Sequence, residues 1–174
     1  MTENAIQSVL NYPPVSRVRR NHGLEHATLH ILSQHSPKRP LAGHSDTRGF
    51  WVLGDVPTDE VQEAVAEAMR RMNAGEQNLA VHPNCGTNFV TSGILAGLAA
   101  FAALFGAGRS FRDRLERLPM AAVLATLALV ASQPLGLLLQ ERVTTSGQLG
   151  SLRVVKVIPS KRGRMRAHRV LTEG

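Results

Sequence analysis

The chain has 174 residues, enough for one domain or slightly more, and 43% of them are apolar. Its single cysteine, Cys85, excludes a disulfide within the chain and is typical of a reducing compartment. Aromatic residues make up only 4% of the sequence, which argues against the stacked aromatic platforms that bind single-stranded nucleic acids.

The formal net charge of +7 is unevenly distributed. Residues 1–86 hold 8 basic and 9 acidic side chains, whereas residues 140–174 hold 8 basic and 2 acidic ones. A basic tail of this kind can bind anionic lipid or nucleic acid, because phosphate groups attract Lys and Arg. A solvated strand face explains the same charges.

Two helices are expected in the first 35 residues. Met1–Tyr12 is weakly amphipathic and is followed by two prolines, which predicts a short helix that ends there. A second helix is expected to be capped by Ser16 or Asn21 and to end near Ser33. Its predicted apolar stripe consists of Leu24, Ala27 and Ile31.

The second helix carries the sequence H-G-L-E-H. On a helix, His22 and His26 lie within about 40° of each other around the axis, with Glu25 beside them. Zn²⁺ accepts such a pair of imidazoles, and the spacing H-x-x-E-H is that of the inverted zinc peptidases. Gly23 costs about 1 kcal/mol relative to Ala inside a helix, which predicts that another backbone or a metal ligand approaches closely there.

The segment after this helix predicts a loop, a strand and a further helix. Ser36–Gly43 is rich in helix breakers and is expected to be a loop, and Gly49–Gly54 is expected to be a short strand. Pro57 opens a helix with acidic residues in its first turn, and Asn73 ends it. The apolar positions that should pack on the histidine helix are Val61, Val65, Ala68 and Met72.

A second cluster of metal-binding residue types follows this helix, in a short turn. Pro83 and Gly86 predict a tight turn that carries His82 and Cys85. Imidazole and thiolate are preferred zinc donors, and a turn of fixed shape can aim both at one point.

Two apolar segments predict a transmembrane hairpin. Residues 87–107 and 118–139 are each long enough for a helix to cross a hydrocarbon core of about 30 Å. A pair of buried helices in a soluble bundle is the alternative, but such helices are usually shorter and carry a polar face. Gly93 and Gly97 form a G-x-x-x-G pattern, which permits close approach of the second span or of a second copy of the chain.

Two prolines and four arginines mark the second span. The connector Arg109–Arg117 holds the four arginines. Pro119 suits the first turn of the span, and Pro134 predicts a kink near its end.

The tail predicts a β-hairpin. Leu152–Ile158 and Arg164–Leu171 alternate with period two around a turn at Pro159–Gly163, and the expected partner is the strand at Phe50–Leu53. The predicted fold is therefore α+β: a head of helices with a short sheet in residues 1–86, a transmembrane hairpin in residues 87–139, and a basic β-hairpin in residues 140–174 that packs on the head.

The H-G-L-E-H motif and the H-P-N-C-G-T-N-F motif at residues 82–89 occur in this order ahead of an apolar span. Together they resemble the motifs of a family of uncharacterised bacterial membrane proteins described as predicted metal-dependent enzymes. The resemblance covers residues 21–89 and the following span and implies a metal site, without implying a particular reaction. The chain departs from that family in its shorter length and at Asn84, where a basic residue is usual. The matching residues are His22, Gly23, Glu25, His26, His82, Pro83, Cys85, Gly86, Thr87 and Phe89.

One hypothesis is a hydrolase. His22, His26 and one of His82 or Cys85 then bind Zn²⁺ or another divalent transition metal, and Glu25 is the general base on metal-bound water. Asn84 or Asn88 steadies an oxyanion, and the substrate is a peptide, a lipid head group or an amide near the bilayer. The inverted zinc peptidases take their third ligand from a glutamate far downstream, for which the candidates by elimination are Glu60, Glu63, Glu67 and Glu76.

A second hypothesis is a membrane scaffold with a closed structural zinc site. His22, His26, His82 and Cys85 fill all four positions, and Glu25 orients a ligand imidazole. The basic tail then contacts anionic lipid. The sequence does not decide between the two hypotheses.

Localisation is predicted from the charges and the spans. Both termini lie on one side of a two-span protein with 16 of the 20 basic residues, although the four arginines of the connector oppose that orientation. The single cysteine and the missing secretory signal favour a cytoplasmic head and tail in the cell membrane. Given the spans, lipid is the expected partner of the tail, and nucleic acid binding is not expected.

Overall fold

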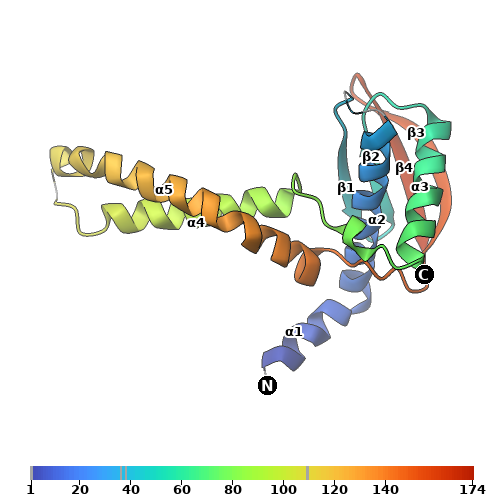
Figure 1. The fold of residues 1–174 in the computed structure, drawn as a ribbon, viewed down its shortest axis with the longest axis horizontal. Helices are drawn as coiled ribbons and strands as arrows, with labels where there is room; N and C mark the ends of the chain where they lie inside the picture. Colours follow the sequence, from blue (N-terminus) through green and yellow to red (C-terminus); the bar gives the residue numbers. More distant parts are fainter. Residues whose placement is uncertain (1, 36, 38, 109) are drawn as a thin grey trace. The chain divides into compact units, whose positions relative to one another are not determined.

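The structure is a computed structural model that describes residues 2–35, 37, 39–108 and 110–174 (Figure 1). Its five α-helices and four-stranded antiparallel sheet confirm the predicted α+β class. The chain forms two compact units, residues 1–82 with residues 141–174, and residues 83–140. The first unit therefore contains both the histidine helix and the C-terminal tail.

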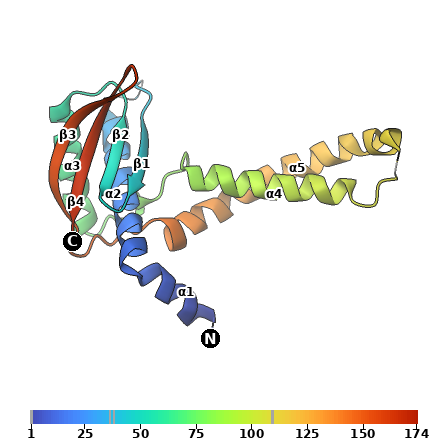
Figure 2. The same ribbon diagram turned by 180° about the vertical axis from the view of Figure 1, so that it is seen from behind.

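In the first unit, helices cover one face of the sheet. Figures 1 and 2, taken from opposite sides, show α2 and α3 against one face and the strands on the other side. The predicted stripe of α2 and the predicted apolar positions of α3 are buried in this interface, as expected. The helices and strands of the unit are α1 (Thr2–Asn11), α2 (Pro13–His35), β1 (Ala42–Asp46), β2 (Gly49–Leu53), α3 (Thr58–Asn73), the 3₁₀-helix η1 (Gln77–Ala80), the π-helix η2 (Gln140–Thr144, whose first residue belongs to the second unit), β3 (Arg153–Arg162) and β4 (Met165–Glu173).

The sheet order β1-β2-β4-β3 confirms the predicted partner of the tail hairpin. β4 pairs with β2 in a register that places Phe50 opposite Val170, and both side chains are fully buried against the helices. Because β4 is an inner strand, the C-terminal segment is part of the hydrophobic core and not an appendage.

The boundaries of α2 differ from the prediction. The helix begins at Pro13, where a missing N–H costs nothing because the first-turn N–H groups have no helical partner, and it continues to His35. Asn21 is therefore inside the helix and is not its cap. Its side chain donates to the Asp46 carbonyl (2.8 Å) and accepts from the Thr172 hydroxyl (2.7 Å), which joins α2 to β1 and β4.

Two features of the sheet were not predicted correctly. The loop expected up to Gly43 ends earlier, because β1 begins at Ala42 and its backbone pairs with β2. β3 runs through Pro159 and the tight turn lies at Gly163, whose φ of +61° suits glycine. A proline is tolerated there because β3 is an edge strand. Ser36 and Lys38, in the expected loop, lie outside the described residues.

The second unit is a hairpin of α4 (Gly86–Leu104) and α5 (Phe111–Leu139). The connector is shorter than predicted, because the Ser110 side chain caps α5 and the helix already begins at Phe111. Pro119 is consequently inside the helix and not in its first turn. Arg109 lies outside the described residues.

Polar groups and one glycine join the two helices of the hairpin. The Ser92 and Ser132 hydroxyls are 2.6 Å apart, and the Gln140 amide donates to Asn88 Oδ1 at 2.6 Å. A Cβ at Gly136 would come within 2.6 Å of the same oxygen, so Gly136 permits the close approach. At Gly93 and Gly97 a Cβ would meet no described atom within 4 Å, so the G-x-x-x-G pattern does not mediate this contact; association of two copies through it stays a prediction.

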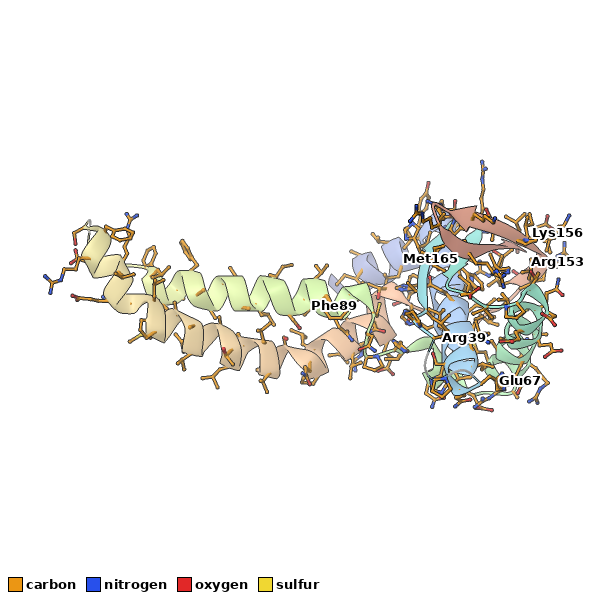
Figure 3. All side chains as sticks on the ribbon, turned by 90° about the horizontal axis from the view of Figure 1, so that it is seen from above. Arg39, Glu67, Phe89, Arg153, Lys156 and Met165 are labelled. Carbon is orange, nitrogen blue, oxygen red and sulfur yellow. The ribbon has the colours of Figure 1, made fainter. Side chains whose placement is uncertain are left out.

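Both helices of the hairpin are long and apolar enough to cross a membrane. Few of their residues are buried, and large apolar side chains such as Phe89, Phe101 and Leu127 are exposed. Figure 3 shows side chains projecting outward along the whole hairpin, with Phe89 labelled. This exposure does not fit the alternative of two helices buried in a soluble bundle.

The buried His168 predicts a loss of stability at acidic pH. It lies on β4 with Nε2 3.0 Å from the Thr58 hydroxyl, and burial and the nearby Arg166 lower its pKa. Because its folded-state pKa lies below the unfolded value of about 6.5, the free energy of unfolding should fall as the pH drops below about 6.5. Denaturant unfolding of the full chain in detergent, followed by Trp51 fluorescence, measures this.

His168→Gln is the matched variant for that measurement. It keeps a polar side chain near Thr58 but removes the titrating group, so its stability should depend less on pH between about 7.5 and 5. The interpretation is wrong if the variant and the natural chain lose the same free energy over that range, because the other histidines would then account for it.

Candidate metal centre

Helix α2 holds two predicted ligands side by side. The rings of His22 and His26 have centroids 4.4 Å apart at an interplanar angle of 64°. Their proximity follows from the four-residue spacing within a continuous helix, as the sequence predicted. His82, which belongs to the same unit, lies with its ring centroid 5.9 Å from that of His26.

Both helix histidines are oriented by main-chain carbonyls. His22 Nδ1 is 2.9 Å from the Thr144 oxygen, and His26 Nδ1 is 2.8 Å from the Ala80 oxygen. A carbonyl only accepts, so each Nδ1 carries the proton, and in the neutral ring the lone pair is then on Nε2. Metal-binding histidines are typically held by such a bond from their other ring nitrogen. The arrangement therefore fits two Nε2 metal ligands.

Gly23 makes this arrangement possible. A Cβ at position 23 would overlap the Ser146 carbonyl oxygen and lie 3.2 Å from the Ala80 Cβ. The segments that contain Ala80 and Thr144, whose carbonyls bind the two histidines, thus approach α2 at Gly23, the only glycine of the helix. This confirms the predicted close approach of another backbone. Arg19 holds the same segment, since its guanidinium donates to the carbonyls of Arg142, Val143 and Thr145.

Glu25 is buried next to β1. The Ser45 hydroxyl donates to its carboxylate, and a Cβ at Gly43 would overlap that carboxylate. Burial raises the pKa of Glu25 and outweighs the Ser45 hydrogen bond and the nearby His22 and His44, which lower it. β1 was not predicted, and its short, polar sequence gave no signal that it would form the wall around Glu25.

His82 and Cys85 add the remaining predicted donors. Burial, together with the charges of His26 and His30, lowers the pKa of His82 and favours the neutral, ligand-competent imidazole. Cys85 follows His82 by three residues, so chain length alone keeps their Cα atoms within about 11 Å. Within the first unit, the imidazoles of His22, His26 and His82 lie next to one another and are the donors that this unit could offer to a metal ion.

The other predicted site residues are placed differently. Asn84 lies in the turn before α4, and the Asn88 side chain donates to the Pro83 carbonyl (2.7 Å) in addition to its bond with Gln140. Of the downstream glutamates proposed as a third ligand, three pair with arginines on or near α3: Glu60 with Arg39, Glu67 with Arg70 and Glu76 with Arg71.

Comparison with known proteins identifies the family. Residues 17–157 match the sequence profile described as "Domain of unknown function (DUF6391)". The chain belongs to the DUF6391 family. The matched region includes all four predicted metal ligands and both long apolar helices.

An uncharacterized protein of Picosynechococcus sp. is a relative of this DUF6391 protein. It is 34% identical over 139 residues, which are 74% of this chain and 66% of the relative. The chain thus matches slightly less than two thirds of that protein's length. No solved structure matches the chain. These comparisons support the predicted resemblance to an uncharacterised family and assign no chemistry to it.

Gly23→Ala tests the close approach at α2. Ala favours a helix over Gly by about 1 kcal/mol, but its Cβ would overlap the Ser146 carbonyl oxygen. The net effect should be a loss of roughly 1–3 kcal/mol in the free energy of unfolding. Gly93→Ala in α4 is the control, since its Cβ would meet no described atom within 4 Å. Thermal unfolding by circular dichroism compares the two. Equal midpoints would contradict the packing described for Gly23.

Proposed function

We propose that this protein is a metal-dependent hydrolase that acts at a membrane surface. The observation that carries the proposal is the pairing of both Nδ1 atoms on α2 with main-chain carbonyls, next to a buried carboxylate whose pKa is raised. Preset imidazoles bind a metal at little entropic cost, and a carboxylate of raised pKa accepts a proton more readily than an exposed carboxylate does.

The metal ligands proposed are His22, His26, and one or both of His82 and Cys85. Their nitrogen and sulfur donors favour Zn²⁺ or a similar divalent transition metal. When bound, such an ion would lower the pKa of a water molecule and polarise a carbonyl or phosphoryl oxygen.

Glu25 is proposed to be the general base. Burial of Glu25 favours its protonated form. Taking a proton from water is therefore less costly for Glu25 than for an exposed carboxylate. The Ser45 hydroxyl holds one carboxylate oxygen and so fixes the direction of the other. Asn84 is proposed to donate to the oxygen on which negative charge develops in the substrate.

A closed structural zinc site is the alternative function. The presence of four donors in two motifs favours it, and in that case the chain is a membrane scaffold. In the structural alternative, Glu25 would orient a ligand imidazole. The carbonyls of Thr144 and Ala80 already orient both histidines of α2, which supports the catalytic role of Glu25 instead.

The two long apolar helices support a location in the cell membrane, with two spans and both termini on one side. We propose that this side is the cytoplasm, because 16 of the 20 basic residues lie outside the connector between the spans. The substrate would then be a peptide, a lipid head group or an amide close to the bilayer.

Glu25→Gln tests the catalytic role. The amide cannot accept the proton, so hydrolysis should fall by about 10²–10⁴-fold while metal content and thermal stability are retained. Activity of the full chain, reconstituted in liposomes, is measured on 4-nitrophenyl esters, a fluorogenic peptide mixture and phospholipids. Ser45→Ala is a milder companion that leaves the carboxylate in place. Unchanged hydrolysis in Glu25→Gln would eliminate Glu25 as the general base, and no hydrolysis of any of these substrates by the natural chain would contradict the enzyme hypothesis.

Metal analysis tests the proposed ligands. His22→Ala and His26→Ala should each lose most of the metal that co-purifies with the chain, because each removes one nitrogen donor. His35→Ala is the control, since it removes an exposed histidine from the last turn of the same helix. Equal metal content in all three variants would contradict the site, as would a chelator that changes neither activity nor unfolding.

A further inference from the structure

The face of the sheet opposite α2 and α3 carries a cross-strand row around the single tryptophan. Trp51 on β2 lies opposite His44 on β1 and Arg169 on β4, and Arg169 in turn lies opposite Ile158 on β3. Side chains alternate along a strand, so these residues point away from the face that buries Phe50. No helix of the described part of this unit covers this face in Figure 1 or Figure 2.

Two guanidinium groups stack on the tryptophan. The Arg162 carbon Cζ lies 4.5 Å from the Trp51 ring centroid, and that of Arg169 lies 5.3 Å from it. Trp51 remains partly exposed between them. The row therefore presents an amphipathic ring with positive charge on it, a combination found where proteins meet the interface of a bilayer.

The β3–β4 hairpin adds an excess of unpaired charge. Between residues 153 and 173 it holds seven basic side chains and one acidic side chain. Arg153, Arg166 and Arg169 form ion pairs with Glu173, Asp55 and Asp46. Within the described part of the chain, four cations of the hairpin form no ion pair: Lys156, Lys161, Arg162 and Arg164.

Exposed apolar side chains accompany these cations. Val155 and Met165 are each about half exposed, at 53% and 52%. Figure 3 shows Lys156, Arg153 and Met165 along the hairpin strands. Cations attract anionic lipid headgroups, and apolar side chains beside them can enter the boundary with the acyl chains.

We propose that this surface, formed by the Trp51 row and the β3–β4 hairpin, binds the headgroups of anionic phospholipids. The inference concerns a surface distinct from the metal centre and does not depend on the hydrolase proposal. Lipid is favoured over nucleic acid because the exposed strand face offers one aromatic ring, already stacked by arginines, where a single-strand binder needs several. The two long apolar helices of the same chain would keep a bilayer within reach.

Trp51 is itself the probe for this proposal. The full chain is reconstituted into nanodiscs of phosphatidylcholine that carries bromine on its acyl chains, with or without about 30 mol% phosphatidylglycerol. Bromine quenches tryptophan at short range, so Trp51 fluorescence should be quenched at least about threefold more in the anionic discs. About 1 M NaCl should abolish the difference, because the Debye length falls to about 3 Å.

Matched variants separate this surface from net charge. The variant Lys156→Gln, Arg164→Gln removes two unpaired cations of the hairpin and leaves the arginines that stack on Trp51. It should lose most of the anionic quenching. The variant Arg70→Gln, Arg71→Gln removes the same charge from α3 and should retain it. Denaturant unfolding confirms that both variants are folded.

Three results would overturn the proposal. Quenching that is equal in neutral and anionic discs would show that no anionic headgroup is recognised. Equal effects of the two double variants would assign the attraction to net charge and not to this surface. A single-stranded RNA oligonucleotide that alters Trp51 fluorescence at about 0.15 M salt, where anionic discs do not, would identify a nucleic-acid site instead.

Discussion

The close approach of the segment around residues 144–146 to α2 at Gly23 is the contact on which the rest of the candidate site depends. That segment connects the helical hairpin to the C-terminal strands, and the carbonyl of Thr144 orients His22. On the same face of α2, η1 supplies the Ala80 carbonyl that orients His26. Any side chain at position 23 would overlap the Ser146 carbonyl oxygen, so this packing requires glycine at that position.

The sheet places the carboxylate in the same way. Glu25 lies on the side of α2 that faces β1, where Ser45 donates to it and Gly43 leaves room for it. β1 is held by β2, and β2 by β4, so the C-terminal strand supports the wall around Glu25 although it contributes no predicted ligand. This explains why residues 141–174 belong to the same compact unit as the histidine helix.

The sheet also separates two kinds of surface. Its helix-facing side closes the core around Phe50, whereas its other side carries Trp51 beneath two arginines. Strand alternation alone accounts for this division, because neighbouring residues of β2 point to opposite faces. The excess positive charge of residues 140–174 is therefore carried by a structured hairpin, as the alternating pattern of the tail predicted.

The sequence by itself determined the elements whose pattern is local. Helical spacing determined that His22 and His26 meet and that Leu24, Ala27 and Ile31 are buried, and length with apolarity determined the two long helices. Tertiary structure alone decided the ring tautomers, the raised pKa of Glu25, the strand β1 and the place of Pro159 inside an edge strand. The reason is distance along the chain: the carbonyl partners of His26 and His22 lie 54 and 122 residues away, and no periodic pattern within a helix or strand specifies such a pairing.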